Sequence, residues 1–116
     1  MADVIAMPGI DVRRLRAGTI IFVEAEPYFY ELTVMHPVHG VVAVNSNDPA
    51  LRESPVGQVI QSRHESDTGP SMSCWIGKGL VMEIRFRNGT YRSPVVGSAT
   101  LKGNHEDSTP WSYDVF

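Results

Sequence analysis

The segment Leu80–Val96, LVMEIRFRNGTYRSPVV, decides the fold. Two runs rich in strand-forming residues flank Asn88-Gly89, the dipeptide best suited to a two-residue type I′ turn, in which both central residues need φ > 0. The sequence therefore predicts a β-hairpin with its turn at Asn88-Gly89. In that register Phe86 faces Tyr91 and Arg85 faces Arg92.

Alternation along the hairpin sorts its side chains onto two faces. The face predicted to join the core carries Leu80, Met82, Ile84 and Phe86 together with Tyr91, Ser93 and Val95. Because Pro94 has no N–H to donate to the neighbouring strand, we expect a bend or bulge near Ser93-Pro94.

The opposite face of the hairpin gathers Arg85, Arg87 and Arg92. Two arginines directly across from each other repel unless a carboxylate or another anion lies between them. Glu24, Glu31 or Glu83 would supply such a carboxylate within the chain. The alternative is that the three arginines form an open patch that binds an anion or a partner.

Composition predicts one globular domain spanning residues 1–116, because 116 residues suffice for one hydrophobic core and are too few for two. The 18 glycines and prolines are spread along the chain, which favours short strands joined by turns over long helices. We expect a loosely held N-terminal arm over residues 1–10 and an aromatic C-terminal tail over residues 104–116.

Further strands are predicted at Thr19–Ala25, Tyr28–Met35, Val41–Asn45, around Gln58–Ser62 and at Gly97–Leu101. The first is apolar on both faces, as is typical of a central strand or of a strand inside a closed barrel. The fold expected is all-β: a small antiparallel barrel of the SH3-like or OB-like kind, or a compact sandwich, with six to seven short strands. At most one helical turn is predicted, at Val12–Arg16, capped by Asp11.

Charge and cysteine content narrow the classes of function. A net charge of −3 is unlike that of a strongly basic nucleic-acid binder. The single cysteine, Cys74, cannot form an internal disulfide and is typical of a cytoplasmic protein. The chain has no apolar run long enough to cross a bilayer, so we expect no membrane partner.

Few motifs point to catalysis. His36 and His39 are spaced as a pair of zinc ligands can be, but two imidazoles do not complete a zinc site. Nucleophile-elbow, P-loop, HExxH and dinucleotide-binding motifs are all absent from the sequence. We therefore predict no cofactor, and a metal-dependent enzyme ranks third among the functions considered.

Nucleic-acid binding ranks second. Small barrels can bind single strands on aromatic side chains with basic neighbours. Tyr28, Phe29 and Tyr30 lie on one predicted strand, and Tyr91 and Arg92 lie on the hairpin.

The aromatic tail suggests a role in assembly. Trp111, Tyr113 and Phe116 are too apolar to remain in water without cost, so we expect them to dock on their own domain or on another chain. The loops Ser46–Pro55 and Glu65–Ser73 are further candidate contact surfaces. The first-ranked function is therefore a non-enzymatic binding or assembly module, whose partner is another protein or a second copy of the chain.

Overall fold

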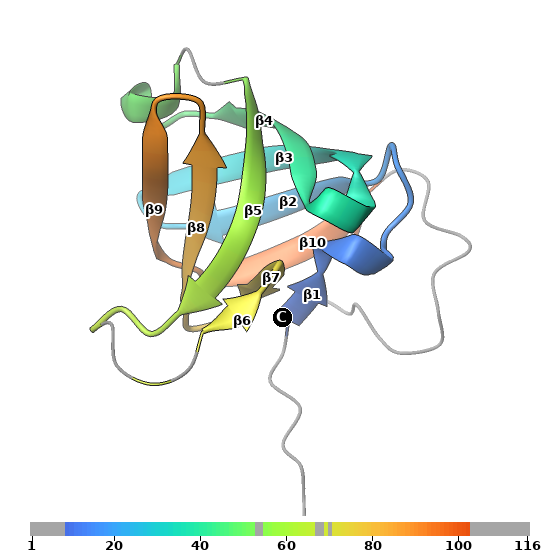
Figure 1. The fold of residues 1–116 in the computed structure, drawn as a ribbon. Coiled ribbons are helices and arrows are strands. Elements are labelled where there is room, and N and C mark those ends of the chain that lie inside the picture. The colour runs from blue at the N-terminus through green and yellow to red at the C-terminus, as the bar shows by residue number, and fades with distance from the viewer. Residues whose placement is uncertain (1–8, 53–54, 67–68, 70, 103–116) are drawn as a thin grey trace, which may run out of the picture.

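A computed structural model of the chain describes residues 9–52, 55–66, 69 and 71–102. These residues form antiparallel strands and three single 3₁₀ turns (Figure 1). In chain order the elements are β1 (Gly9–Asp11), η1 (Val12–Arg14), β2 (Ile20–Ala25), β3 (Tyr28–His36), η2 (Pro37–His39), β4 (Val41–Ser46), η3 (Pro49–Leu51), β5 (Val56–Arg63), β6 (Met72–Ser73), β7 (Trp75–Gly77), β8 (Val81–Phe86), β9 (Gly89–Val95) and β10 (Ser98–Lys102).

The main sheet has the strand order β10-β2-β3-β4-β5-β8-β9, with β6 also paired to β5, and a second sheet joins β1 to β7. The prediction of an all-β, antiparallel fold is confirmed. The closed barrel is not formed, because β9 and β10 end the strand order instead of pairing with each other. The described residues contain ten strands rather than six to seven, and three helical turns rather than one.

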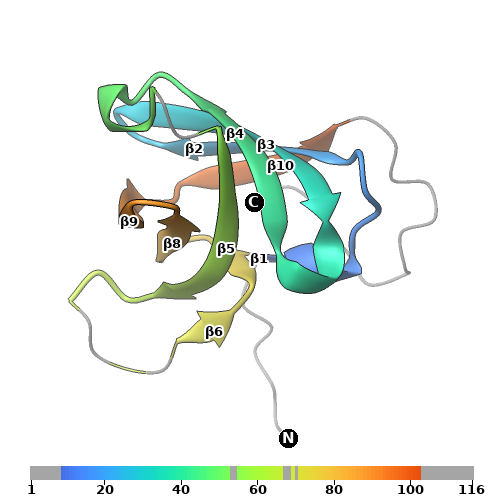
Figure 2. The same cartoon turned by 45° about the horizontal axis from the view of Figure 1, so that its top comes forward.

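The main sheet is rolled into two layers. Strands β5, β8 and β9 lie in front of β10, β2 and β3, and β4 bends over the top to connect them (Figures 1 and 2). The inward side chains of both layers make one hydrophobic core, whose most deeply buried members include Ile21, Val23, Tyr30, Leu32, Val34, Val42, Val59, Met82 and Ile84. Each such side chain contributes roughly 1.5–3 kcal/mol by leaving water.

The hairpin forms, but its register differs from the prediction. Phe86 pairs with Gly89, so the two loop residues are Arg87 and Asn88. Gly89 has φ 144° and is the only residue of the turn with a positive φ. A type I′ turn at Asn88-Gly89 would need a positive φ at Asn88 as well, which explains why the predicted turn is wrong.

The corrected register replaces the facing pairs and keeps the faces. Tyr91 lies opposite Ile84 rather than Phe86, and Arg92 lies opposite Glu83 rather than Arg85. Because the shift is two residues and side chains alternate with a period of two, the core face between Met82 and Ser93 is the one predicted. Beyond the bulge the prediction is wrong, because Val95 pairs with Val81 on the other face and Val96 is the buried residue. The bulge expected at Ser93-Pro94 is confirmed, since the pairing is irregular there and the N–H of Met82 donates to Ser93 Oγ at 3.0 Å.

The N-terminal segment is better packed than expected. Asp11 caps η1, its carboxylate accepting from the backbone N–H of Arg13 at 3.0 Å, so the predicted helical turn is confirmed near its expected place. Ile10, predicted to lie in a loose arm, belongs to β1 and is fully buried. The indole of Trp75 covers Gly9 and Gly77, where any added Cβ would lie within 2.7 Å of the ring system.

A sharp corner explains why the roll stays open. Only Val96 and Gly97 separate β9 from β10. The N–H of Val96 donates to Leu80 O at 2.9 Å, and the N–H of Gly97 donates to Glu24 O at 2.8 Å. These two bonds turn the chain from the front layer into the back layer, where β10 pairs with β2.

Candidate functional site

The outer surface of β10, β2, β3 and β4, which we call the aromatic face, displays large apolar side chains. Phe22 and Phe29 stack on it, with ring centroids 5.8 Å apart and planes inclined by 26°. The ammonium of Lys102 lies 5.3 Å from the centroid of the Phe22 ring. Phe29 is 46% exposed and Met35, further along the same strand, is 41% exposed.

This apolar surface continues onto β5. Val56 pairs with Ala43, which pairs with Thr33, so the three residues share the outer side of the sheet. Val56 is 47% exposed. Three of the four large apolar side chains that are most exposed in the described part of the chain thus lie on one outer surface. The fourth is Val38, in η2, which is 71% exposed.

Polar groups border the aromatic face. Phe29 is held through its backbone, because its N–H donates to Asn47 Oδ1 at 2.9 Å and its carbonyl accepts from Ser46 Oγ at 2.8 Å. Glu24 accepts a hydrogen bond of 2.9 Å from Ser98 Oγ. A hollow of about 300 Å³ lies beside the stacked rings and is lined by Phe22, Phe29, Glu31, Asn45, Ser46 and Asn47.

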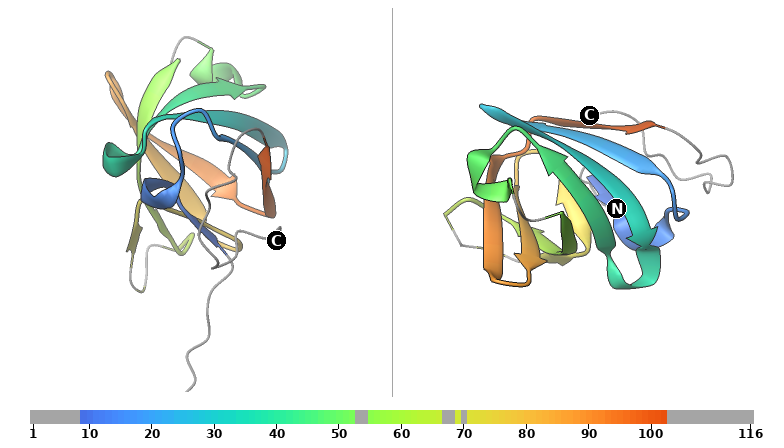
Figure 3. Two further views of the ribbon diagram at one scale, coloured as in Figure 1. Left: turned by 90° about the vertical axis from the view of Figure 1, so that its right-hand side faces the viewer. Right: turned by 90° about the horizontal axis from the view of Figure 1, so that it is seen from above.

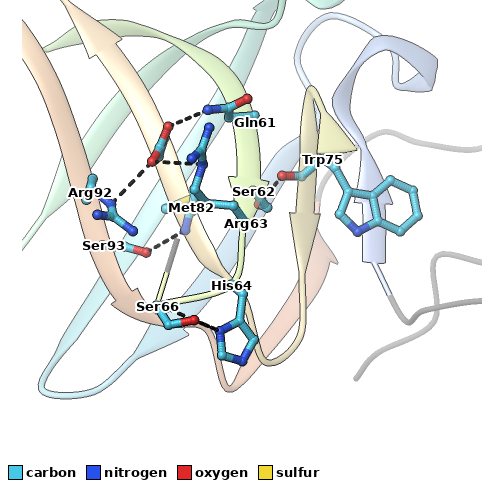
Figure 4. A network of polar contacts seen from close by, with 10 residues as sticks. Gln61, Ser62, Arg63, His64, Ser66, Trp75, Met82, Arg92 and Ser93 are labelled. Carbon is cyan, nitrogen blue, oxygen red and sulfur yellow. Dashed lines mark hydrogen bonds and ion pairs between the residues drawn. The ribbon is translucent and has the colours of Figure 1, made fainter. Parts of the chain in front are cut away.

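The outer surface of β8, β9 and residues 58–63 of β5, which we call the arginine face, is organised around Glu83. The Glu83 side chain is only 10% exposed, and its Oε2 lies 3.2 Å from Arg92 Nε and 3.6 Å from Arg63 Nε. Gln61 Nε2 donates to Glu83 Oε1 at 2.7 Å. Figure 4 shows Gln61, Arg63 and Arg92 converging from β5 and β9.

The three arginines predicted to form a patch lie on this side of the hairpin, but in different surroundings. Arg92 is paired with Glu83, one of the carboxylates considered for that role. Arg85 lies opposite Thr90 and Gln58 and is exposed. Arg87 is exposed within the turn. The expected repulsion between Arg85 and Arg92 is therefore not present as a facing pair.

The tyrosines expected to offer stacking surfaces are used inside the fold. Tyr30 is fully buried, and its hydroxyl lies 2.6 Å from the hydroxyl of Tyr91. Tyr91 in turn donates to the buried carboxylate of Asp48 at 2.5 Å. Burial raises the pKa of Tyr30 to about 12, and burial with the hydrogen bond to Asp48 raises the pKa of Tyr91 far above its usual range. This series of hydrogen bonds joins Tyr30 in the back layer to Tyr91 in the front layer.

The histidine pair does not gather a metal site. His36 ends β3 and His39 ends η2, and both are exposed. Among the residues that the structure describes, no group of three or more His, Cys, Asp or Glu side chains is placed to hold a metal ion. Burial raises the pKa of the Cys74 thiol, so this cysteine is less nucleophilic than an exposed one.

Two sets of predicted contact residues are described in part or not at all. Trp111, Tyr113 and Phe116 lie outside the described residues. Residues 53–54 of the loop Ser46–Pro55, and residues 67–68 and 70 of the loop Glu65–Ser73, also lie outside them.

The aromatic face itself was missed by reasoning from the sequence. Thr19–Ala25 was expected to be a central strand because both its faces are apolar, and β2 is indeed flanked by β10 and β3. That position covers the edges of the strand but leaves one face open. The available signal was the placing of Phe22 and Phe29 on either side of the Glu26-Pro27 turn, which brings them diagonally together in a hairpin.

None of the helical segments in the described residues is long and apolar enough to cross a membrane. Comparisons of the chain with protein-family models, with curated proteins and with solved structures found no match.

Proposed function

We propose that this protein is a non-enzymatic module that binds a protein partner, or copies of itself, through the aromatic face. The observation that supports this most strongly is the gathering of exposed apolar side chains there, with Phe29, Met35 and Val56 each more than two-fifths exposed. Exposed apolar side chains that gather on one surface, with polar residues among and around them, are typical of protein interaction sites. Isolated exposed apolar residues, such as Val38, need no such explanation.

The architecture supports the same proposal. A rolled antiparallel sheet presents an outer surface fixed by backbone pairing, which suits binding without a large conformational change. The backbone of Phe29 is held by hydrogen bonds to Asn47 and Ser46, so this backbone loses little conformational entropy when a partner docks.

The experiment compares two serine variants of the full chain. Phe29→Ser removes an exposed ring from the aromatic face, and Val38→Ser removes an exposed apolar side chain elsewhere. The immobilised wild-type protein is used to capture a partner, and binding of that partner is then measured with both components purified. We expect Phe29→Ser to weaken binding at least about tenfold, a change of about 1.4 kcal/mol. Equal binding by the wild type and both variants would contradict the proposal.

A second candidate function is favoured by the arginine face. Arg63 and Arg92 gather around Glu83 there, and the exposed Arg85 adds a positive charge that suits an anionic ligand such as nucleic acid. If this face binds nucleic acid, affinity should fall steeply with salt, and Arg85→Ala should reduce the salt slope by about one. The control is Arg52→Ala, an exposed arginine outside this face. A flat salt response would exclude this function.

A further inference from the structure

We propose that the chain associates head to tail, with the aromatic face of one copy docked on the arginine face of the next. This inference rests on the proposed function, because it names the occupant of the aromatic face. That occupant is a second copy of the same chain, and the contact joins two different surfaces.

Charge is the first argument. The charged side chains that face outward from β10, β2 and β3 are Glu24, Glu31 and Lys102, a net of −1. On the arginine face the exposed Arg85, with Arg87 in the adjoining turn, adds positive charge beside the cluster around Glu83. Two aromatic faces brought together would therefore repel, as would two arginine faces, whereas an aromatic face attracts an arginine face.

Side-chain chemistry is the second argument. Phe22 and Phe29 present exposed ring surface, and guanidinium groups stack on aromatic rings by cation–π attraction. The aromatic face already holds one such contact, since Lys102 lies over Phe22 within the same chain. Arg85 and Arg87 are exposed and can reach the rings of a neighbouring copy without breaking the pairing between Arg92 and Glu83.

The arrangement of the layers decides the kind of assembly. The two faces are the outer surfaces of opposite layers and point away from each other (Figure 3). A contact between two different surfaces on opposite sides leaves one of each kind free at the ends. Such a heterologous contact propagates into open chains, or into a ring where the rotation closes, rather than stopping at a symmetric dimer.

The test uses one charge-reversing or charge-introducing variant for each face, made in the full chain. Phe29→Arg places a cation on the aromatic face and leaves the arginine face intact. Arg85→Glu places an anion on the arginine face and leaves the aromatic face intact. Both residues are exposed, so each variant should fold, which circular dichroism and urea unfolding will verify. Val38→Arg and Arg52→Glu make the same chemical changes outside both faces and serve as matched controls.

Sedimentation velocity over a range of concentrations gives the readout. The wild type and both control variants should form species larger than a dimer as concentration rises. Each face variant alone should associate at least about tenfold more weakly. An equimolar mixture of Phe29→Arg and Arg85→Glu should form a 1:1 dimer, because one intact aromatic face meets one intact arginine face. The two altered faces gain at most one exposed ion pair, worth about 0.2–1 kcal/mol, which is too little to extend the dimer. Raising the ionic strength from about 0.1 M to about 1 M, which shortens the Debye length from about 10 Å to about 3 Å, should weaken association of the wild type.

Three results would overturn head-to-tail association. A self-associating Arg85→Glu variant would show that the aromatic faces pair with each other. A mixture that fails to dimerise while the wild type assembles would place the contact elsewhere. A wild type that stays monomeric at every concentration would show that its partner is a different molecule or its own C-terminal segment. That last result leaves the proposed function standing, because the capture experiment with Phe29→Ser tests it separately.

Discussion

The arginine face and the aromatic face are built from the same elements and treat their side chains in opposite ways. Both are outer surfaces of antiparallel strands within one rolled sheet. On the arginine face, a carboxylate that is only 10% exposed holds Arg63, Arg92 and Gln61 around it. On the aromatic face, Phe29 remains 46% exposed although its backbone is fixed on both sides.

The difference teaches where stability and binding reside. Side chains that contact one another within the fold contribute to its free energy of unfolding and are poorly available to a partner. Side chains held in place by backbone bonds, yet exposed, contribute little to folding and can bury more surface on docking. We therefore expect substitution of the paired side chains around Glu83 to act on stability. Substitution of the exposed Arg85, or of exposed side chains on the aromatic face, should act on binding.

The largest effect on stability is expected for Glu83→Ala. It leaves Arg63 and Arg92 beside each other without the carboxylate that both contact. Removing one member of a fully buried ion pair costs about 3–5 kcal/mol. The side chains of Arg63 and Arg92 are 31% and 40% exposed, so water screens part of the interaction. We therefore expect the free energy of unfolding to fall by a smaller amount, about 1–3 kcal/mol. Urea unfolding measures it.

The matched control on the other face is Glu31→Ala. Glu31 borders the hollow beside the stacked rings and is half-buried. A surface substitution away from a charge network changes stability by less than about 0.5 kcal/mol. Equal losses for the two glutamates would break the distinction between the faces.

An effect of similar size to that of Glu83→Ala is expected for Tyr91→Phe, which tests how the two layers are joined. The Tyr91 hydroxyl lies between Tyr30, in the back layer, and Asp48, in the connection from β4 to β5. Its removal leaves two buried polar groups without this partner, at a cost of about 1–3 kcal/mol for such groups. The comparison is urea unfolding of Tyr30→Phe, which removes only the hydrogen bond between the two tyrosine hydroxyls and keeps the one from Tyr91 to Asp48. An unchanged free energy of unfolding for Tyr91→Phe would show that packing alone joins the layers.

The same contact predicts how stability depends on pH. The folded pKa of Tyr30 is about 12, above its usual value of 10, so folding favours the protonated phenol. This contribution is complete below pH 10 and is lost as the pH rises from 10 toward 12. We expect the free energy of unfolding to fall across that range, and the fall to be smaller in Tyr30→Phe. A fall of the same size in that variant would assign the alkaline loss to other groups.

Much of this fold follows from the sequence, and the exceptions have identifiable causes. The hairpin, its core face as far as Ser93 and the bulge at Pro94 follow from alternation and from a missing N–H. The facing pairs do not follow, because the turn depends on a single φ angle at Asn88. The partner of Arg92 was therefore left open between three carboxylates, and only the two-residue register shift selects Glu83.

The open roll and the aromatic face share a different cause. Whether β9 meets β10 depends on the corner at Val96-Gly97, whose hydrogen bonds reach Leu80 and Glu24 in separate parts of the chain. Local patterns carry no information about such contacts. An apolar residue on the outer side of β2, such as Phe22, likewise shows that a surface is apolar but not whether another layer covers it.

A small effect on stability is expected for Phe29→Ser, and it is the sharpest test of the comparison. Nearly half of the Phe29 surface is in water, and its backbone bonds to Asn47 and Ser46 do not involve the ring. The stack on Phe22 contributes an amount offset in part by the side-chain freedom that serine regains, so we expect a loss below about 1 kcal/mol. Urea unfolding of Phe29→Ser beside Val38→Ser measures it. A loss of about 3 kcal/mol, typical of a buried ring, would mean that the ring serves the fold and not a partner. In that case the exposed aromatic pair would belong to the same class of residues as Glu83, and the division of labour between the two faces would disappear.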